Sequence, residues 1–114
     1  MSLVAPAGAS MGLSDATLAQ ICATLAEFPQ VAQGVLYGSR AKGNFKPGSD
    51  IDLTLRGDGL TLSLLGDIDM ALDDLLLPYE IDLSIYEQLG HAELVAHIDR
   101  VGRVIYQKWQ SSQI

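Results

Sequence analysis

The chain has 114 residues, of which 48% are hydrophobic and 18% charged, so it predicts one domain whose core needs no disulfide or structural metal. Its net charge of −7 argues against a nucleic-acid partner, because proteins held by phosphate contacts carry a basic patch. No apolar run reaches the roughly 20 residues that span a bilayer, and we expect neither a signal peptide nor a membrane association. The single cysteine, Cys22, allows no intramolecular disulfide and fits a reducing cytoplasm.

Hydrophobic periodicity and turn residues divide the chain into alternating helices and strands. The predicted elements are, in chain order, a flexible leader over 1–13, a helix over 15–27, a strand over 31–37, a short helix over 39–42, a strand over 50–56, a helix over 62–77, a strand over 79–86, a helix over 91–101 and a short strand over 104–106. Ser14 is a typical N-cap, and Gly102 suits a C-cap. We expect the folded domain to span 14–106, followed by a polar tail over 107–114.

This order predicts an α/β (α+β) fold, with a small mixed β-sheet and flanking helices. Side chains alternate between the two faces of a strand. In the strand over 79–86 the apolar residues therefore share one face, and Glu80 and Asp82 share the other. We expect that second face to carry Asp50 and Asp52 as well.

The stretch from Gly38 to Leu53 combines two features that suit phosphate chemistry. Asp50 and Asp52 are two residues apart, so on a strand they point the same way, with Cα atoms roughly 6–7 Å apart. A divalent cation relieves the repulsion between two such carboxylates, because hard cations prefer oxygen ligands. The turn at Gly38-Ser39 offers backbone N–H groups that can cradle a phosphate. Together they predict a phosphoryl- or nucleotidyl-transfer site.

The same stretch resembles a known family of enzymes. The residues that carry the resemblance are Gly38-Ser39, then Arg40-Ala41-Lys42-Gly43, then Ser49 and the carboxylates of Asp50 and Asp52. Their pattern is similar to the motif of the minimal nucleotidyltransferase (MNT) branch of the DNA polymerase beta-like nucleotidyltransferase superfamily. The resemblance covers about residues 31–106. It implies a nucleotidyltransferase core and activity.

The resemblance also implies roles for single residues. Asp50, Asp52 and Asp82 would be the catalytic carboxylates and would bind two Mg²⁺ ions. Asp82, the third carboxylate, would also help to deprotonate the acceptor hydroxyl. Glu80 lies on the same predicted face and is the alternative to Asp82.

ATP is the nucleotide donor that the resemblance implies. Gly38 and Ser39 would hold its β- and γ-phosphates. Arg40 or Lys42 would offset the charge of the triphosphate, and the sequence does not decide between them. Ser49 is a candidate for the nucleotide site, with the alternative that it serves as a turn or cap residue.

Three functions remain open, two of them catalytic with different acceptors and one non-catalytic. The first is transfer of AMP to a hydroxyl, for which a tyrosine is suited, on a partner HEPN-type toxin, so that the chain acts as an antitoxin. The second is nucleotidyl transfer to a small molecule, and the third is a non-catalytic antitoxin that acts by binding. A homo-oligomer is left open. His91 and His97 lack a metal-ligand pattern, so we expect surface or helix-cap residues.

Overall fold

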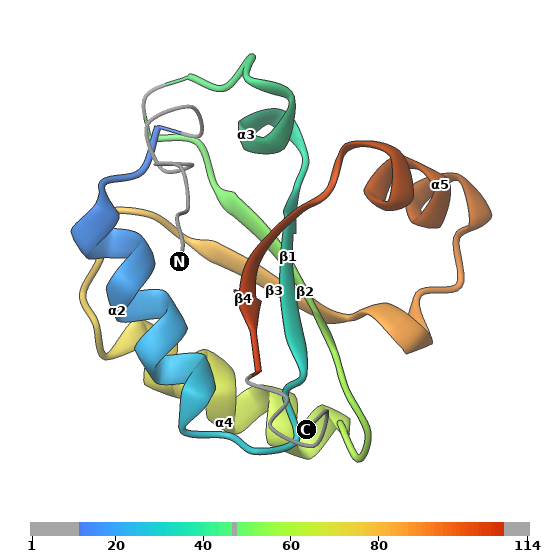
Figure 1. Cartoon of the computed structure of the whole chain (residues 1–114). Coiled ribbons are helices and arrows are strands. Elements are labelled where there is room, and N and C mark those ends of the chain that lie inside the picture. Colours follow the sequence, from blue (N-terminus) through green and yellow to red (C-terminus); the bar gives the residue numbers. More distant parts are fainter. Residues whose placement is uncertain (1–11, 47, 109–114) are drawn as a thin grey trace, which may run out of the picture.

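The computed structural model describes residues 12–46 and 48–108 (Figure 1). The helices and strands of this part are, in chain order, α2 (Asp15–Ala26), β1 (Gln33–Tyr37), α3 (Ser39–Lys42), β2 (Ile51–Arg56), α4 (Leu62–Asp73), β3 (Ile81–Ile85), the 3-10 helix η1 (Tyr86–Gln88), α5 (Ala92–Val101) and β4 (Arg103–Gln107). Most of the expected leader, residues 1–11, and most of the expected tail, residues 109–114, lie outside the described residues.

The strands form one four-stranded sheet in the order β3-β2-β1-β4. β1 is antiparallel to both of its neighbours, β2 and β4, whereas β2 and β3 are parallel. The predicted small mixed sheet is therefore confirmed. The parallel pair is joined through α4, as expected for a crossover between parallel strands.

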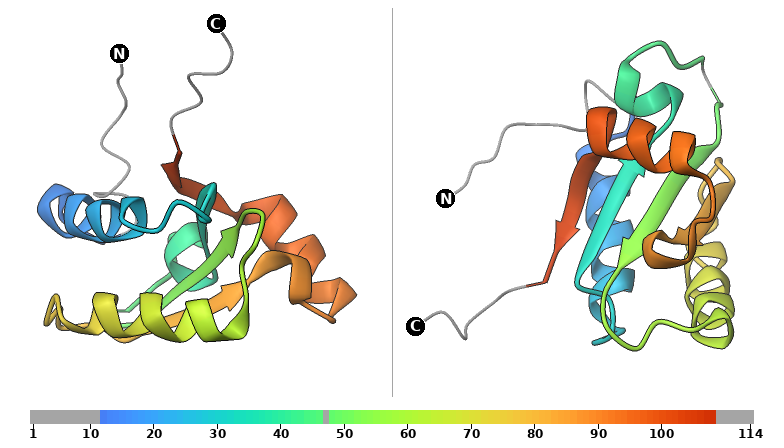
Figure 2. Two further views of the ribbon diagram at one scale, coloured as in Figure 1. Left: turned by 90° about the horizontal axis from the view of Figure 1, so that it is seen from below. Right: turned by 90° about the vertical axis from the view of Figure 1, so that its right-hand side faces the viewer.

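Helices cover both faces of the sheet (Figure 2). One face packs against α2 and α4, and the larger core lies between this face and the two helices. Its fully buried residues include Ile21, Leu36, Leu53 and Ile68. The other face packs against α5 and holds a smaller cluster centred on Val35, Tyr37 and Ile98. No helix in the described part of the chain is long and apolar enough to cross a membrane.

Hydrogen bonds from capping side chains fix where the two long helices begin. The hydroxyl of Ser14 accepts a hydrogen bond from the backbone N–H of Thr17 at 3.0 Å, which confirms the predicted N-cap of α2. The hydroxyl of Thr61 accepts from the N–H of Leu64 at 3.1 Å at the start of α4. Each cap satisfies a backbone donor that has no partner inside its helix.

Three local predictions differ from the structure. The helix expected to reach residue 77 ends at Asp73, because the backbone tightens there into i→i+3 hydrogen bonds, from the N–H of Leu75 to Leu72 and from the N–H of Leu76 to Asp73, and Leu76 then takes a positive φ of 56°. Gly102 does cap α5, but in an extended conformation, and a Cβ there would collide with Val35. Leu13 is only 2% exposed and belongs to the core, so the packed domain begins before Ser14.

Candidate active site

Strands β2 and β3 bring two of the predicted catalytic carboxylates side by side. Asp52 and Asp82 are direct partners in the parallel register, so their side chains leave the same face of the sheet. This confirms the predicted shared face for Asp52 and Asp82, whereas Glu80 directly precedes β3, so its place on that face stays a prediction. On the other side of Asp52, Tyr37 of β1 is its antiparallel partner, which extends the row across three strands. Asp50 directly precedes β2 and is exposed.

Negative charge is concentrated at Asp52. Partial burial raises the pKa of its carboxyl, and the carboxylates of Asp82 and Asp50 raise it further. The imidazole of His97 acts in the opposite direction, as the smallest of these influences on that pKa. The pKa of Tyr37 is also raised, mainly because its hydroxyl is partly buried. A cation placed against Asp52 would relieve this repulsion and favour the ionised form.

Gly38 brings the turn between β1 and α3 against Asp52. Its φ of 78° and ψ of −154° belong to a backbone conformation that side chains disfavour. A Cβ on Gly38 would also collide with the Oδ2 atom of Asp52. Glycine is therefore needed for the conformation and for the close approach. Because Ser39 follows at the start of α3, the predicted phosphate-binding turn and the carboxylates lie together.

His97 on α5 also contacts this turn, although the sequence did not single it out. Its Nε2 accepts a hydrogen bond from the backbone N–H of Gly38 at 3.3 Å. Its ring packs edge-on against Tyr37, with ring centroids 6.3 Å apart. The expectation of a surface or helix-cap residue is therefore wrong for His97. One sequence signal pointed to this contact. His97 follows Leu94 by three residues and so lies on the same side of α5, and Leu94 packs against the cluster of Val35, Tyr37 and Ile98.

The two basic residues of α3 lie in different environments. Arg40 is 2% exposed, and its guanidinium donates to the carbonyl oxygen of Ser49 from Nε at 3.1 Å and from Nη2 at 2.8 Å. Lys42, in contrast, is exposed. The geometry therefore favours Lys42 over Arg40 as a phosphate contact, a choice that the sequence left open.

Ser49 has a turn role that accounts for its hydroxyl. Its Oγ donates to the carbonyl of Lys46 at 2.7 Å and accepts from the N–H of Lys46 at 2.9 Å. Such side-chain bonds to nearby backbone stabilise tight turns. A direct contact between Ser49 and a nucleotide stays a prediction.

The donor atoms fit a magnesium ion that binds together with a nucleotide. Within residues 12–46 and 48–108, no three His, Cys, Asp or Glu side chains are grouped closely enough to hold a metal by themselves. Asp52 and Asp82 supply hard oxygen donors from adjacent register positions. Magnesium in proteins commonly uses one or two carboxylates and completes its shell with substrate phosphates and water. This chain suits that mode better than a preformed structural metal site.

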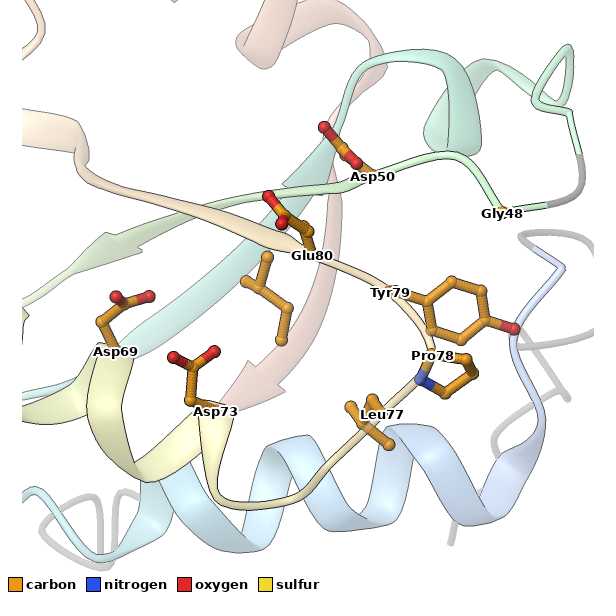
Figure 3. A pocket seen from close by; sticks show the side chains of 9 residues that line it. Gly48, Asp50, Asp69, Asp73, Leu77, Pro78, Tyr79 and Glu80 are labelled. Atoms are coloured by element: carbon orange, nitrogen blue, oxygen red, sulfur yellow. The ribbon is translucent and has the colours of Figure 1, made fainter.

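An acidic pocket of about 510 Å³ borders this site (Figure 3). It lies between the loop before β2, the last turns of α4 and the segment that leads into β3. The carboxylates of Asp69 and Asp73 project from α4 toward it, whereas those of Asp50 and Glu80 point away from α4 (Figure 3). Asp50 lines this pocket and is also one of the predicted metal ligands, so the pocket is continuous with the predicted site.

A mixed sheet with paired carboxylates beside a Gly-Ser turn is typical of nucleotidyltransferases. The chain belongs to the Polymerase beta, Nucleotidyltransferase family, whose match covers residues 19–111. That segment contains every residue assigned to the site above. Comparison with the curated proteins gave no significant match.

Solved structures with the same fold are found in toxin–antitoxin complexes. A toxin-antitoxin crystallised with AMP-PNP is 20% identical with a TM-score of 0.66, covering 84% of this chain and 75% of the other. The toxin-antitoxin MntA-HepT is 18% identical with a TM-score of 0.63, covering 88% and 75%. The complex of tri-AMPylated Shewanella oneidensis HEPN toxin with MNT antitoxin is 18% identical with a TM-score of 0.61, covering 86% and 73%. At these identities the likeness shows a shared fold.

Proposed function

We propose that this chain is a magnesium-dependent nucleotidyltransferase that moves AMP from ATP to a hydroxyl of a partner protein. The observation that carries the proposal is the register of Asp52 with Asp82, together with the backbone of Gly38 packed against Asp52. Family membership supports nucleotidyl transfer as the class of reaction. The raised pKa of Asp52 supports a cation there, because burial and neighbouring carboxylates disfavour its ionised form.

The proposed binding roles combine the resemblance to nucleotidyltransferases with the position of each residue. Asp50, Asp52 and Asp82 hold two magnesium ions, which, when bound, neutralise phosphate charge and stabilise the attacking and leaving oxygens. Gly38 and Ser39 hold the β- and γ-phosphates through the backbone of their turn. Lys42, which is exposed, offsets the remaining charge of the triphosphate.

The proposed reaction is an in-line displacement at the α-phosphorus of ATP. The acceptor oxygen forms a bond to this phosphorus, and the bond from the phosphorus to the bridging oxygen of the β-phosphate breaks. The pair of electrons of that bond leaves with pyrophosphate. Asp82, which is exposed on the edge strand β3, takes the proton of the acceptor hydroxyl.

The proposed acceptor is a tyrosine of a HEPN-type toxin, so that the chain acts as its antitoxin in the cytoplasm. One similar fold comes from a complex whose HEPN toxin is tri-AMPylated, and another was crystallised with AMP-PNP. The net charge of −7 suits a partner with a basic surface, as a toxin that binds RNA would have. A tyrosine hydroxyl lies far from its backbone and so can reach the α-phosphorus beside Asp82.

Intact-mass spectrometry of the partner tests the proposal. The proposed partner, a HEPN-type protein sought among the neighbouring genes, is incubated with the chain, ATP and magnesium. We expect the mass of one or more AMP groups to be added, and none with the Asp50→Ala, Asp52→Ala double variant. A partner whose mass is unchanged while its toxicity is suppressed would replace transfer by a binding-only antitoxin.

A further inference from the structure

The buried guanidinium of Arg40 joins α3 to the loop that leads into Asp50. We propose that Arg40 is a positioning residue, which fixes the backbone at Asp50 and the direction of its Cα–Cβ bond, and thereby influences the affinity for magnesium with nucleotide. The inference rests on the proposed function, because it takes Asp50 as a metal ligand. It gives Arg40 a task different from the phosphate contact that the motif suggested.

Arg40 reaches Asp50 through the peptide group that precedes it. Two nitrogens of the guanidinium, Nε and Nη2, donate to the same oxygen, the carbonyl of Ser49, at 3.1 and 2.8 Å. That carbonyl belongs to the peptide plane that also contains the N–H of Asp50. Fixing the oxygen therefore fixes the orientation of the backbone as it enters Asp50.

A second hydrogen bond fixes the backbone on the other side of Asp50. The N–H of Ile51 donates to the carbonyl of Glu80 at 2.8 Å. Both peptide planes that meet at the Cα of Asp50 are thus held, one by Arg40 and one by the segment before β3. With these planes held, the direction of the Cα–Cβ bond is set, although Asp50 is exposed and lies outside β2.

The surroundings of Arg40 require a guanidinium and not merely a positive charge. Its Cζ atom lies 5.1 Å from the ring centroid of Phe45 and 4.7 Å from that of Tyr79. A planar guanidinium can stack on aromatic rings while its N–H groups donate in their own plane. Tyr79 directly precedes Glu80, so the same guanidinium also contacts the segment that holds Ile51. A lysine has neither the plane nor the fork of donors and cannot replace these contacts.

Calorimetry of AMP-PNP binding, with magnesium and with EDTA, separates positioning from general support of the fold. For Arg40→Lys we expect the gain in affinity due to magnesium to fall by about tenfold, as for other residues that orient metal ligands. Affinity in EDTA should stay close to that of the wild type. In the Asp50→Asn background, Arg40→Lys should have little further effect, because the residue through which it acts is gone.

Arg56→Met is the matched control, since Arg56 also stacks on a tyrosine, with Cζ 4.3 Å from the ring centroid of Tyr86. It should leave the magnesium-dependent gain unchanged. The inference is wrong if Arg40→Lys keeps the wild-type gain, or loses as much affinity in the Asp50→Asn background as in the wild type. If Arg40→Lys does not fold, the Arg40→Met variant, which keeps the apolar stem, takes its place under the same criteria. A wild type that binds AMP-PNP equally with and without magnesium contradicts the proposed function instead.

Discussion

Asp52 and Asp82 lie directly beside each other on the parallel strands β2 and β3, and the pKa of Asp52 is raised. The folded chain therefore holds like charges together at a point where the unfolded chain does not. This arrangement costs stability whenever Asp52 is ionised. We attribute this cost to the cation and nucleotide that these carboxylates are proposed to bind.

Replacing Asp52 by Asn should leave the apo protein as stable as the wild type or more so, while transfer is lost. A raised pKa in the folded state means that the free energy of unfolding falls as pH rises from the ordinary aspartate value of 3.8 through the raised value. Asp52→Asn should remove that fall. Thermal unfolding between pH 3 and 8 measures the difference, with exposed Asp67→Asn as the control. A melting temperature several degrees below the wild type would make Asp52 a structural residue.

Replacing Asp82 by Asn should lower the pKa of Asp52. Burial is the largest cause of the raised pKa and Asp82 is the second largest, so only part of the pKa shift should disappear. NMR titration of the Asp52 carboxyl in the apo protein measures it. Glu80→Gln is the control, and it also tests Glu80 as a substitute for Asp82. An unchanged pKa in Asp82→Asn, or equal loss of transfer in both variants, would contradict the assignment.

Gly38→Ala should destabilise the fold by about 1–3 kcal/mol, because alanine disfavours the positive φ and its Cβ would collide with Asp52. ATP binding should weaken as well, since the phosphate-binding turn must shift. Denaturant unfolding and calorimetry measure the two effects. Gly66 lies in α4 with open space around it, so Gly66→Ala should be neutral or stabilising by up to about 1 kcal/mol. Equal effects of the two substitutions would mean that the Gly38 turn carries no special constraint.

His97→Ala should cost about 1 kcal/mol of stability, because the N–H of Gly38 loses its acceptor, and should weaken ATP binding several-fold, because the turn at Gly38 and Ser39 loses the contact that holds it in place. His91→Ala provides the comparison. His91 is the N-cap of α5, but its side chain makes no capping hydrogen bond, so its removal should change neither property. If the two variants behave alike, the contact between His97 and Gly38 has no part in binding.

Much of the fold follows from local patterns in the sequence. The alternation of Ile81, Asp82 and Leu83 predicted which face of β3 carries the carboxylate, and the register confirms it. The cap at Ser14 was predictable because its hydroxyl bonds only three residues away. By contrast, the end of α4 could not be predicted from the apolar pattern. Leu75 and Leu77 continue the helical spacing of apolar residues, but they pack against the core from irregular backbone beyond the helix.

The parts of the site that depend on distant segments could not be predicted. From the sequence, Arg40 is predicted to contact phosphate because it belongs to a basic, glycine-containing motif. Its burial depends on Phe45 and Tyr79 closing over it, and Tyr79 is nearly forty residues away along the chain. His97 meets Gly38 across 59 residues. Spacing rules describe neighbours on one element, and these contacts join different elements.

The central claim is that the chain transfers the nucleotidyl group of ATP and not its terminal phosphoryl group. Two parallel incubations with magnesium and the HEPN-type partner test this most directly, one with ATP labelled at the α-phosphorus and one with ATP labelled at the γ-phosphorus. The account predicts that the partner acquires the α-label alone, and that the Asp50→Ala, Asp52→Ala variant transfers neither. Transfer of the γ-label, or equal α-labelling by wild type and variant, would contradict it.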